Sequence, residues 1–261
     1  MSDTFIYISI SLFGLIIGSF LNVCIYRLPR EKSIVRPSSF CTHCLKPIRW
    51  FDNIPVISFV ILRGRCRECG KRISFQYPAV ETITALIFCL NFHFFGLTPA
   101  FLIWNVFACS LLVASVIDFH FQLIPDLISL SGIIVGLALR FFVPQFLSIA
   151  SEKPFLDSLL GVLAGGGSIY LLGLIGTFAF RKESMGFGDV KLMAMIGAFL
   201  GWKLVLLCFF IAPVFGSVWG IFLKIKYKQD IMPYGPFLSL ASLVCLYLGK
   251  DMLDFFLFGL L

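Results

Sequence analysis

Apolar residues dominate this chain in long, nearly uninterrupted runs. Eight such runs follow one another, at residues 5–25, 79–96, 99–118, 123–143, 158–180, 189–202, 203–223 and 235–249. A helix that crosses a bilayer needs about 20 predominantly apolar residues, and most of the runs approach that length. The pattern therefore predicts an all-α, polytopic integral membrane protein with about eight transmembrane helices, in which the run at 189–202 is short for a span.

One long polar segment interrupts the pattern between the first two runs. Residues 30–77 contain four of the nine cysteines and most of the charge in the first third of the chain. We expect this segment to form a small insert outside the membrane. After the last run, a tail with Lys250, Asp251 and Asp254 either lies on the membrane surface or extends the last helix.

Composition excludes most other classes of protein. The 261 residues are 59% hydrophobic and 13% charged, whereas a soluble domain is about half apolar and a quarter charged. An ordinary cytosolic protein, a disordered chain and a secreted disulfide scaffold are all incompatible with these values. The first run lacks the basic n-region and the small-residue cleavage site of a secretory signal, so we expect it to be a retained span.

The positive charge is concentrated in the insert. The formal net charge is +7, and eleven of the 21 Lys and Arg residues lie between Arg27 and Arg72. Basic loops of membrane proteins stay on the cytosolic side, which predicts a cytosolic insert and an N-terminus outside. Nucleic-acid binding is the alternative for a basic chain, but no aromatic residues are interleaved with the charges as in a stacking platform. We expect the bilayer, and no nucleic acid, as the partner.

Four cysteines in the insert form two C-x₂-C pairs. Cys41 and Cys44 make the first pair, and Cys66 and Cys69 make the second. This spacing is typical of a structural Zn²⁺ site with four thiolates, which leaves no open position for a catalytic water. A small insert also needs such a staple, because it has too little area for a core. Disulfides and idle thiols are the alternatives; disulfides are rare in the cytosol. His43 is then a bystander.

Acidic residues inside apolar runs are costly and usually functional. Asp118 ends the third run, and Asp189 follows Gly186-Phe187-Gly188 at the start of the sixth. Under the predicted topology both lie at the cytosolic membrane edge. Two carboxyls at one place can share a proton, so that one stays protonated while the other withdraws a proton from water. The glycines permit a close approach of the backbone.

Each aspartate also has a structural interpretation. Asp189 could be a helix N-cap after a glycine, and Asp118 could be a solvated helix end. Asp126 follows Pro125 and is also acidic. For Asp126 we favour the role of a turn or cap residue.

Taken together and in order, these motifs resemble those of the bacterial type IV prepilin peptidases, a family of G-x-G-D aspartic proteases that also methylate their product. The resemblance covers nearly the whole chain. The matching segments are Gly18–Val23 with Tyr26–Pro29, Asp52–Pro55, Ser58, Gly64, the four Cys, Tyr77-Pro78, Glu81, Asp118 with Ile124–Asp126, Lys182–Lys191 and Tyr234–Phe237.

The resemblance implies roles for particular residues. Asp118 and Asp189 would be the catalytic pair, and Cys41, Cys44, Cys66 and Cys69 would hold Zn²⁺. The methylation function would involve Gly64 and Arg65, just before the third cysteine. Arg65 stands where Lys is common in the family, a change that keeps the charge but not the hydrogen-bond geometry. Residues 1–80 would form a methylation-linked part with the first span, and residues 81–261 a transmembrane peptidase domain.

The implied reaction has two steps. The leader of a type IV prepilin, or of a pseudopilin of type II secretion, would be cleaved after a Gly at the cytosolic face of the bacterial inner membrane. The new N-terminal residue, usually Phe, would then be methylated from S-adenosylmethionine. The alternatives are a peptidase of the same fold without methylation, a membrane scaffold whose zinc insert docks a partner, and a transporter in which the acidic residues mark an ion path. The intact Cys insert argues against the first of these.

Overall fold

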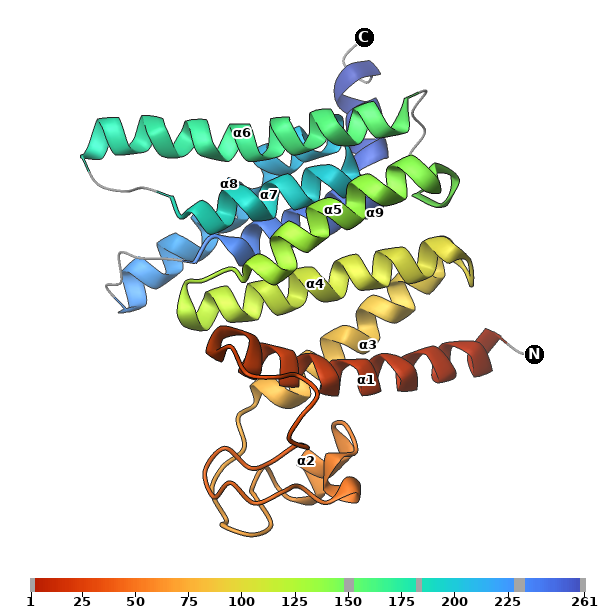
Figure 1. Ribbon diagram of the computed structural model, residues 1–261, viewed down its shortest axis with the longest axis vertical. Helices are drawn as coiled ribbons and strands as arrows, with labels where there is room; N and C mark the ends of the chain where they lie inside the picture. The colour runs from red at the N-terminus through yellow and green to blue at the C-terminus, as the bar shows by residue number, and fades with distance from the viewer. Residues whose placement is uncertain (1–2, 148–152, 182–184, 228–232, 259–261) are drawn as a thin grey trace. The chain divides into compact units, whose positions relative to one another are not determined.

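The computed structural model describes residues 3–147, 153–181, 185–227 and 233–258. Each predicted apolar run forms a helix (Figure 1). The helices are α1 (Asp3–Arg27), α3 (Gln76–Phe95), α4 (Pro99–Phe121), α5 (Asp126–Phe142), α6 (Pro154–Phe180), α7 (Phe187–Leu200), α8 (Trp202–Tyr227) and α9 (Gly235–Phe258). Within the described ranges the only extended pairings are two isolated bridges, so the predicted all-α class is confirmed. Because α9 continues through Asp254, the tail extends the last helix.

Six of these helices are long and apolar enough to cross a membrane, namely α1, α3, α4, α6, α8 and α9. The other two are shorter, with 17 residues in α5 and 14 in α7. Short helical turns occur outside the long helices, at η1 (Leu28–Arg30), η2 (Trp50–Asn53), α2 (Ile57–Ile61) and η3 (Pro144–Leu147).

Prolines and a glycine define several of the helix boundaries. Pro125 precedes α5 in an extended conformation, and Pro154 is the first residue of α6. Proline suits the start of a helix because its missing N–H would have no partner there. Gly201 ends α7 with a φ of +82°, and this left-handed conformation is one that glycine adopts at little cost.

The chain divides into two compact units, Met1–Cys109 and Ser110–Leu261, and the division falls inside α4. In the N-terminal unit, α1 packs along α3. The two backbones approach closely at Gly14 and Gly18 of α1. A Cβ at Gly18 would lie 2.6 Å from the Cα of Glu81, and one at Gly14 would lie 2.7 Å from the Cα of Ala85. Small residues permit this kind of helix contact within a bilayer.

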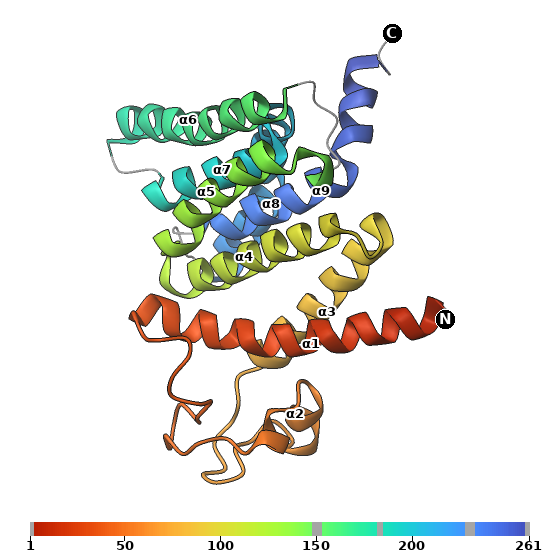
Figure 2. The ribbon, with the colours of Figure 1, turned by 45° about the vertical axis from the view of Figure 1, so that its right-hand side comes forward.

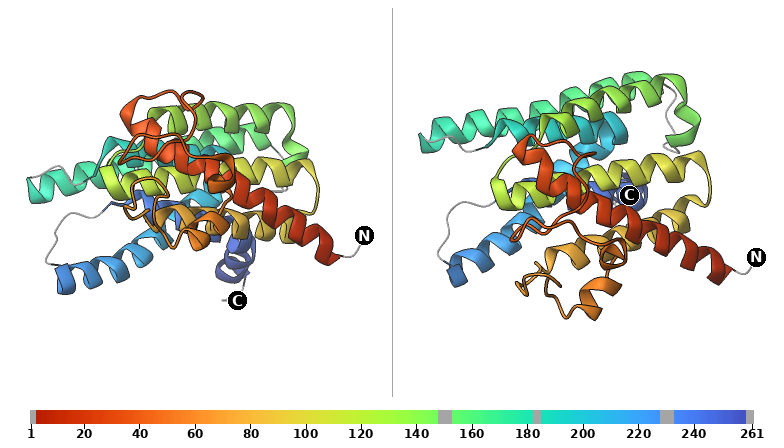
Figure 3. Two further views of the ribbon diagram at one scale, coloured as in Figure 1. Left: turned by 90° about the horizontal axis from the view of Figure 1, so that it is seen from below. Right: turned by 60° about the horizontal axis from the view of Figure 1, so that its bottom comes forward.

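The C-terminal unit is organised around the short helix α7. Residues 192–200 of α7 are all buried, because α5, α6, α8 and α9 all contact this helix. Figures 2 and 3 show α5, α6 and α7 running alongside one another. The predicted functional division between 1–80 and 81–261 stays a prediction.

The C-terminal end of α7 is stabilised by buried polar side chains. A helix of 14 residues rises about 21 Å, less than the roughly 30 Å of a hydrocarbon core. Its last carbonyls therefore lie away from water and need protein donors. Ser158 Oγ donates to the carbonyl of Ala198 at 2.6 Å, and Arg140 Nη2 donates to that of Phe199 at 2.7 Å. These bonds let α7 end inside the bundle.

Candidate active site and metal site

Asp118 lies in the last turn of α4 and is buried, with 6% of the residue exposed. Its Oδ2 accepts a hydrogen bond of 2.9 Å from the backbone N–H of Gly235, the first residue of α9. The interpretation of Asp118 as a solvated helix end is therefore wrong. The chain brings a backbone donor from more than a hundred residues away to this carboxylate.

Asp189 is the third residue of α7. The helix begins after Gly186, which occupies the N-cap position, and the Asp189 N–H donates to the Gly186 carbonyl at 3.1 Å. The alternative interpretation of Asp189 as the N-cap is therefore wrong. The carboxylate is free of that capping role.

The buried side chain of Ile124 connects the elements that carry the two aspartates. A Cβ at Gly188, next to Asp189, would lie 3.2 Å from the Ile124 Cβ. A Cβ at Gly235 would lie 3.3 Å from the Ile124 Cδ1 and 2.8 Å from the Asp118 Oδ2. Ile124 thus fits tightly against both glycines, and at Gly235 a side chain would also displace the Asp118 carboxyl. The predicted close approach of the backbone occurs at Gly188.

This arrangement suits acid–base chemistry on a water molecule. Two carboxyls whose charges interact in a buried place resist ionising together, so one retains a proton and the other is a base. The N–H of Gly235 occupies one oxygen of Asp118, which fixes the orientation of that carboxyl. The roles of Asp118 and Asp189 as the acid and the base of an amide hydrolysis stay predictions.

Asp126 has a different environment. It is the first residue of α5, and its Oδ1 pairs with Lys191 Nζ of α7 at 2.5 Å. Its side chain is 59% exposed, against 22% for Lys191. Pro125 occupies the N-cap position of α5 and no side chain caps the helix, so the predicted role of Asp126 as a cap residue is wrong; Asp126 lies in the first turn. The ion pair joins the start of α5 to α7, two residues beyond Asp189.

The four cysteines of the insert converge. One ligand atom from each of Cys41, Cys44, Cys66 and Cys69 lies within 4.8 Å of every other. The Cys41 and Cys69 sulfurs are 3.9 Å apart. Sulfurs at about 2.3 Å from a tetrahedral Zn²⁺ lie about 3.8 Å from one another, so this separation fits a shared ion. A disulfide would need about 2.05 Å, and the cysteines are free, so the disulfide alternative is wrong.

Each C-x₂-C pair is held by the same local turn. The Cys41 N–H donates to the Lys46 carbonyl at 3.0 Å, and the Cys66 N–H donates to the Lys71 carbonyl at 2.8 Å. In both turns the residue after the second cysteine has a left-handed conformation, with a φ of +59° at Leu45 and +67° at Gly70. The two halves are therefore structural repeats that present two sulfurs each.

The cysteines of the cluster differ in acidity. A backbone hydrogen bond at Lys71 lowers the pKa of Cys69, but burial and the neighbouring thiols raise it to about 11. Partial burial raises the pKa of the Cys41 thiol, but backbone hydrogen bonds at Cys44 and His43 outweigh it and lower the pKa to about 7. His43 contributes this backbone group and is not among the four clustered ligands, as predicted. A thiol with a lowered pKa gives up its proton to a metal more readily.

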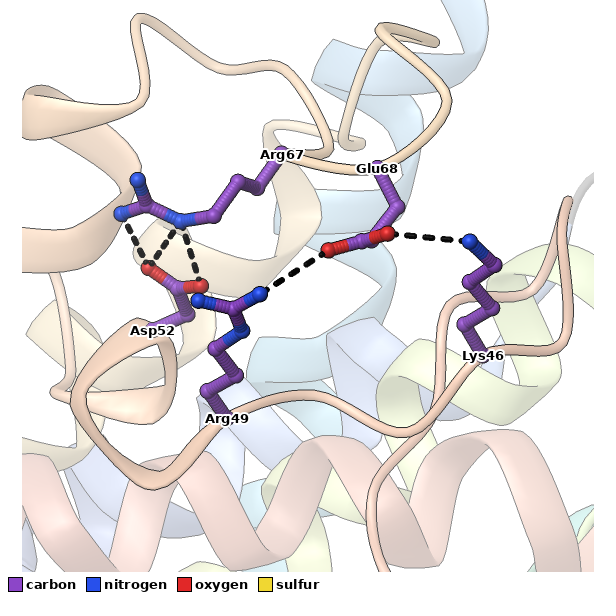
Figure 4. Close-up of polar contacts among 5 residues, drawn as sticks. All are labelled: Lys46, Arg49, Asp52, Arg67 and Glu68. Atoms are coloured by element: carbon purple, nitrogen blue, oxygen red, sulfur yellow. Dashed lines mark hydrogen bonds and ion pairs between the residues drawn. The ribbon is translucent and has the colours of Figure 1, made fainter.

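Ion pairs connect the two halves of the insert, as Figure 4 shows. Glu68 lies between Lys46 at 3.0 Å and Arg49 at 3.5 Å, and the guanidinium of Arg67 binds both oxygens of Asp52. The hydrogen bond from Arg67 lowers the pKa of Asp52. Each pair links a residue near the first C-x₂-C turn to one inside the second, which holds the two turns together.

Gly64 and Arg65 lead into the second C-x₂-C turn. Gly64 has a φ of +66°, and its Cβ position lies 3.1 Å from the ring of Phe59. The Gly64 N–H donates to the Phe59 carbonyl at 2.8 Å, and its carbonyl accepts from the Ile73 N–H at 2.7 Å. Arg65 pairs with Arg72 through the backbone, and its side chain is exposed. The methylation roles of both residues stay predictions.

Two features of the site were missed by sequence reasoning. Although Tyr234–Phe237 is among the matching segments, the Gly235 N–H could not be found as the donor to Asp118, because a backbone group gives no signal of its partner in the sequence. The pairing of Lys191 with Asp126 had no local signal, because the two residues are 65 positions apart and belong to different helices. Residues 182–184, which begin the second predicted motif, lie outside the described residues.

Comparisons with known proteins agree on one family. The Bacterial Peptidase A24 N-terminal domain matches residues 12–95, and the Type IV leader peptidase family matches residues 105–221. Proteins named prepilin leader peptidase/N-methyltransferase are similar over nearly their full lengths. The protein from Pseudomonas putida is 34% identical, over 91% of this chain and 89% of its own; that from Bacillus subtilis is 33% identical, over 94% and 96%. The Legionella pneumophila protein is 32% identical, over 97% and 95%. No solved structure matches the chain.

Proposed function

The chain belongs to the type IV leader peptidase family, and we propose that it removes the leader peptide of type IV prepilins or pseudopilins and methylates the new N-terminal residue. The names of its relatives, which give both activities, support this proposal. The observation that supports the peptidase part is that Gly235, whose N–H binds Asp118, and Gly188, which precedes Asp189, both lie against the side chain of Ile124.

In the proposed hydrolysis, one carboxylate of the pair takes a proton from water. The water oxygen then bonds to the carbon of the scissile amide, while the protonated partner donates its proton to the carbonyl oxygen. Collapse of the tetrahedral species breaks the C–N bond as the leaving amine takes up the proton held by the base. The other carboxylate takes back a proton from one hydroxyl of the tetrahedral species, which restores the starting state of the pair. The hydrogen bond from Gly235 to Asp118 keeps one oxygen of that carboxyl in place through these transfers.

The position of the pair suits the proposed substrate. Asp118 lies at the end of a long apolar helix, and Asp189 at the beginning of another. A prepilin leader is polar, and an apolar helix follows it. Cleavage between the leader and this helix takes place at the edge of the membrane. The end of α4 and the beginning of α7, which carry the two aspartates, lie at the same level. We propose that this edge is the cytosolic face of the inner membrane, since the basic residues gather there by the positive-inside bias.

For the metal, we propose that Cys41, Cys44, Cys66 and Cys69 hold one structural Zn²⁺. Four thiolates complete its coordination, so the ion supplies folding free energy to the insert and no step of hydrolysis. For methylation, we propose S-adenosylmethionine as the donor. The insert, with Gly64 and Arg65, is the part to which a soluble cofactor has access from the water side, and Arg65 offers an exposed cation there.

Co-expression of the chain with a prepilin tests the function. Mass spectrometry of the pilin reads both steps, the first as loss of the leader and the second as the added mass of one methyl group. Asp118→Asn and Asp189→Asn keep the size of the side chain and remove its acid–base function. Each should lower leader removal by at least about 10³-fold, to background, with unchanged insertion.

Asp126→Asn is the matched control, because it removes the third acidic group of this region. We expect it to retain substantial cleavage. An active Asp118→Asn enzyme together with an inactive Asp126→Asn enzyme would refute the assignment of the pair. A wild-type chain that leaves the prepilin uncut would favour the scaffold or the transporter, and a cut but unmethylated pilin would favour a peptidase alone.

A further inference from the structure

We propose that residues 50–62, which comprise η2 and α2 and are here termed the α2 segment, enter the bilayer beside α1 and α3 as a re-entrant segment. The rest of the insert then lies on the membrane surface. This proposal concerns the N-terminal unit alone. It depends on the membrane embedding of α1 and α3 and does not depend on the proposed function.

The depth of the α2 segment follows from its attachment to α3. The N–H of Val56, which precedes α2, donates to Glu81 Oε2 at 2.7 Å. Glu81 packs against Gly18 of α1, where a Cβ would lie 2.6 Å from the Glu81 Cα. Gly18 precedes Arg27, the last residue of α1, by nine residues, which corresponds to about 13 Å along a helix. The attachment therefore lies well inside the end of α1. Figures 1 and 2 show α2 set off to one side of α1, at a level between the two ends of that helix.

The surface of the α2 segment is apolar where it is exposed. In α2, Ile57 is 52% exposed, Val60 67% and Ile61 68%. The single polar residue of α2, Ser58, is buried and donates to the carbonyl of Phe51 at 3.0 Å. In water this arrangement would expose the large side chains of a helix and bury its only hydroxyl. Beside two spans it is the arrangement that lipid favours.

The flanking residues fit a segment that enters and leaves the same face of a bilayer. Arg49 precedes the segment and Arg63 follows it. Trp50, at its start, is 81% exposed, and tryptophan is enriched at the level of the headgroups. The only charged residue between the two arginines is Asp52, which is neutralised by the bidentate contact with Arg67. A membrane with anionic headgroups complements these cations.

Several backbone N–H groups of the α2 segment have protein partners, which a bilayer requires of a buried backbone. The N–H groups of Val56, Ser58, Val60 and Leu62 donate to Glu81, Ile54, Val56 and Ser58 in turn. Val56 itself has a φ of +59°, which is strained for a β-branched residue. Such strain persists where the surroundings require it, and here it aims the Val56 N–H at the Glu81 carboxyl. The attachment is therefore specific.

Photolabelling of the unmodified protein tests this. The full chain in vesicles is exposed to a phospholipid that carries a diazirine near the end of its acyl chain, then denatured and digested with trypsin. Cleavage after Arg49 and Arg63 releases residues 50–63 as one peptide. Cleavage after Lys32 and Arg49 releases residues 33–49, because Arg36 and Lys46 precede prolines. We expect several-fold more label per residue in the first peptide.

Residues 33–49 are a stringent control, because they also expose large apolar side chains, at Val35 and Leu45. Equal labelling of the two peptides at the level of a soluble loop would overturn the proposal. If residues 50–63 took up little lipid label but formed cross-links to an added prepilin, the surface would belong to a substrate helix. That result would also overturn the proposal.

A second measurement gives the depth. Val60→Trp and Val35→Trp each add one indole at an exposed position, so the native tryptophans cancel between the two variants. Val35 lies at the end of α1, because Arg27 donates to the carbonyls of Ser33 and Pro37 at 2.9 and 2.7 Å. In vesicles of acyl-brominated phospholipid, the added fluorescence of Val60→Trp should be quenched at least twofold more than that of Val35→Trp. The proposal would be refuted if the brominated lipid quenched Val35→Trp more strongly and iodide in the water quenched Val60→Trp more strongly.

Discussion

The insert and the C-terminal unit build their sites in opposite ways. In the insert, each half of the cysteine cluster is closed by hydrogen bonds between residues five positions apart, from Cys41 to Lys46 and from Cys66 to Lys71. In the C-terminal unit, Asp118 and Asp189 depend on helices that are distant in the chain and on a backbone donor from α9. A metal site can therefore be specified by local turns, whereas the acid pair exists only when the whole bundle has packed.

The two regions also differ in what stabilises them. The insert has little buried apolar surface and depends on its four sulfurs and a few ion pairs. The C-terminal unit depends on a central helix that is buried along nine residues. Damage to one region should therefore leave the other intact. The following predictions test that independence, in order of decreasing effect.

Removal of one thiolate should abolish the fold of the insert. Structural zinc contributes about 10–16 kcal/mol in small metal-dependent domains, more than the insert can replace from its own contacts. We expect wild-type protein to contain about one Zn²⁺ per chain, and Cys41→Ser or Cys66→Ser to contain none. Residues 30–77 should then become sensitive to protease, while α4–α9 remain protected. Metal analysis with limited proteolysis measures both. Fresh wild-type protein without zinc would contradict the assignment.

A methyl group at Gly235 should damage the other region. In Gly235→Ala the new Cβ would lie 2.8 Å from the Asp118 Oδ2 and 3.3 Å from Ile124, so the carboxyl or α9 must shift. A displacement of this size costs about 10²-fold in rate. The initial rate of leader removal in membranes should fall by about that factor, with the zinc content unchanged.

Gly167→Ala is the matched control for Gly235→Ala. It makes the same chemical change in α6, where a Cβ would meet nothing within 4 Å, and we expect nearly wild-type rates. If both variants lost activity equally, a general effect on the bundle would replace the specific contact with Asp118.

Within the insert, Gly64→Ala and Gly70→Ala separate backbone strain from local contact. Both glycines have a left-handed φ, +66° and +67°, so both variants carry about 1–2 kcal/mol of strain. Only Gly64 has a neighbour, the ring of Phe59 at 3.1 Å. We expect Gly64→Ala to lower methylation severalfold with leader removal largely intact, and Gly70→Ala to affect methylation less. Mass spectrometry of the processed pilin measures both steps.

Equal losses of methylation in the two glycine variants would indicate that Gly64 serves only the zinc turn. Loss of zinc and of cleavage together in Gly64→Ala would support the same conclusion. Full methylation by Gly64→Ala would remove this residue from the methylation site.

The smallest effect is expected at the ion pair between Asp126 and Lys191. Exposed pairs of this kind contribute up to about 1 kcal/mol, and the Asp126 side chain is 59% exposed. Asp126→Asn, Lys191→Met and the double variant should each shift the Tm in detergent by no more than about 4 °C. The coupling in the double-mutant cycle should shrink at high salt. A large coupling that salt leaves unchanged would contradict the description of this pair as exposed.

Much of this architecture is determined by the sequence alone. The runs of apolar residues specify the helices, because a bilayer permits few other ways to satisfy the backbone. The spacing of Cys41, Cys44, Cys66 and Cys69 specifies a four-sulfur cluster, because each pair closes within its own turn. The G-x-G-D segment likewise marks the start of α7 and the place of Asp189.

Tertiary structure decided what these local patterns left open. Asp118 is buried and bound by Gly235, although its position at a helix end is equally compatible with solvent. Asp126 forms an ion pair with Lys191. Several acidic residues lie nearby in the sequence, and only the packing of α5 on α7 determines which of them meets this lysine. The apolar α2 segment is attached to Glu81 inside a stretch that the sequence marks as polar. In each case the partner comes from a distant element, and sequence periodicity reports which face of an element is apolar but not which element will cover it.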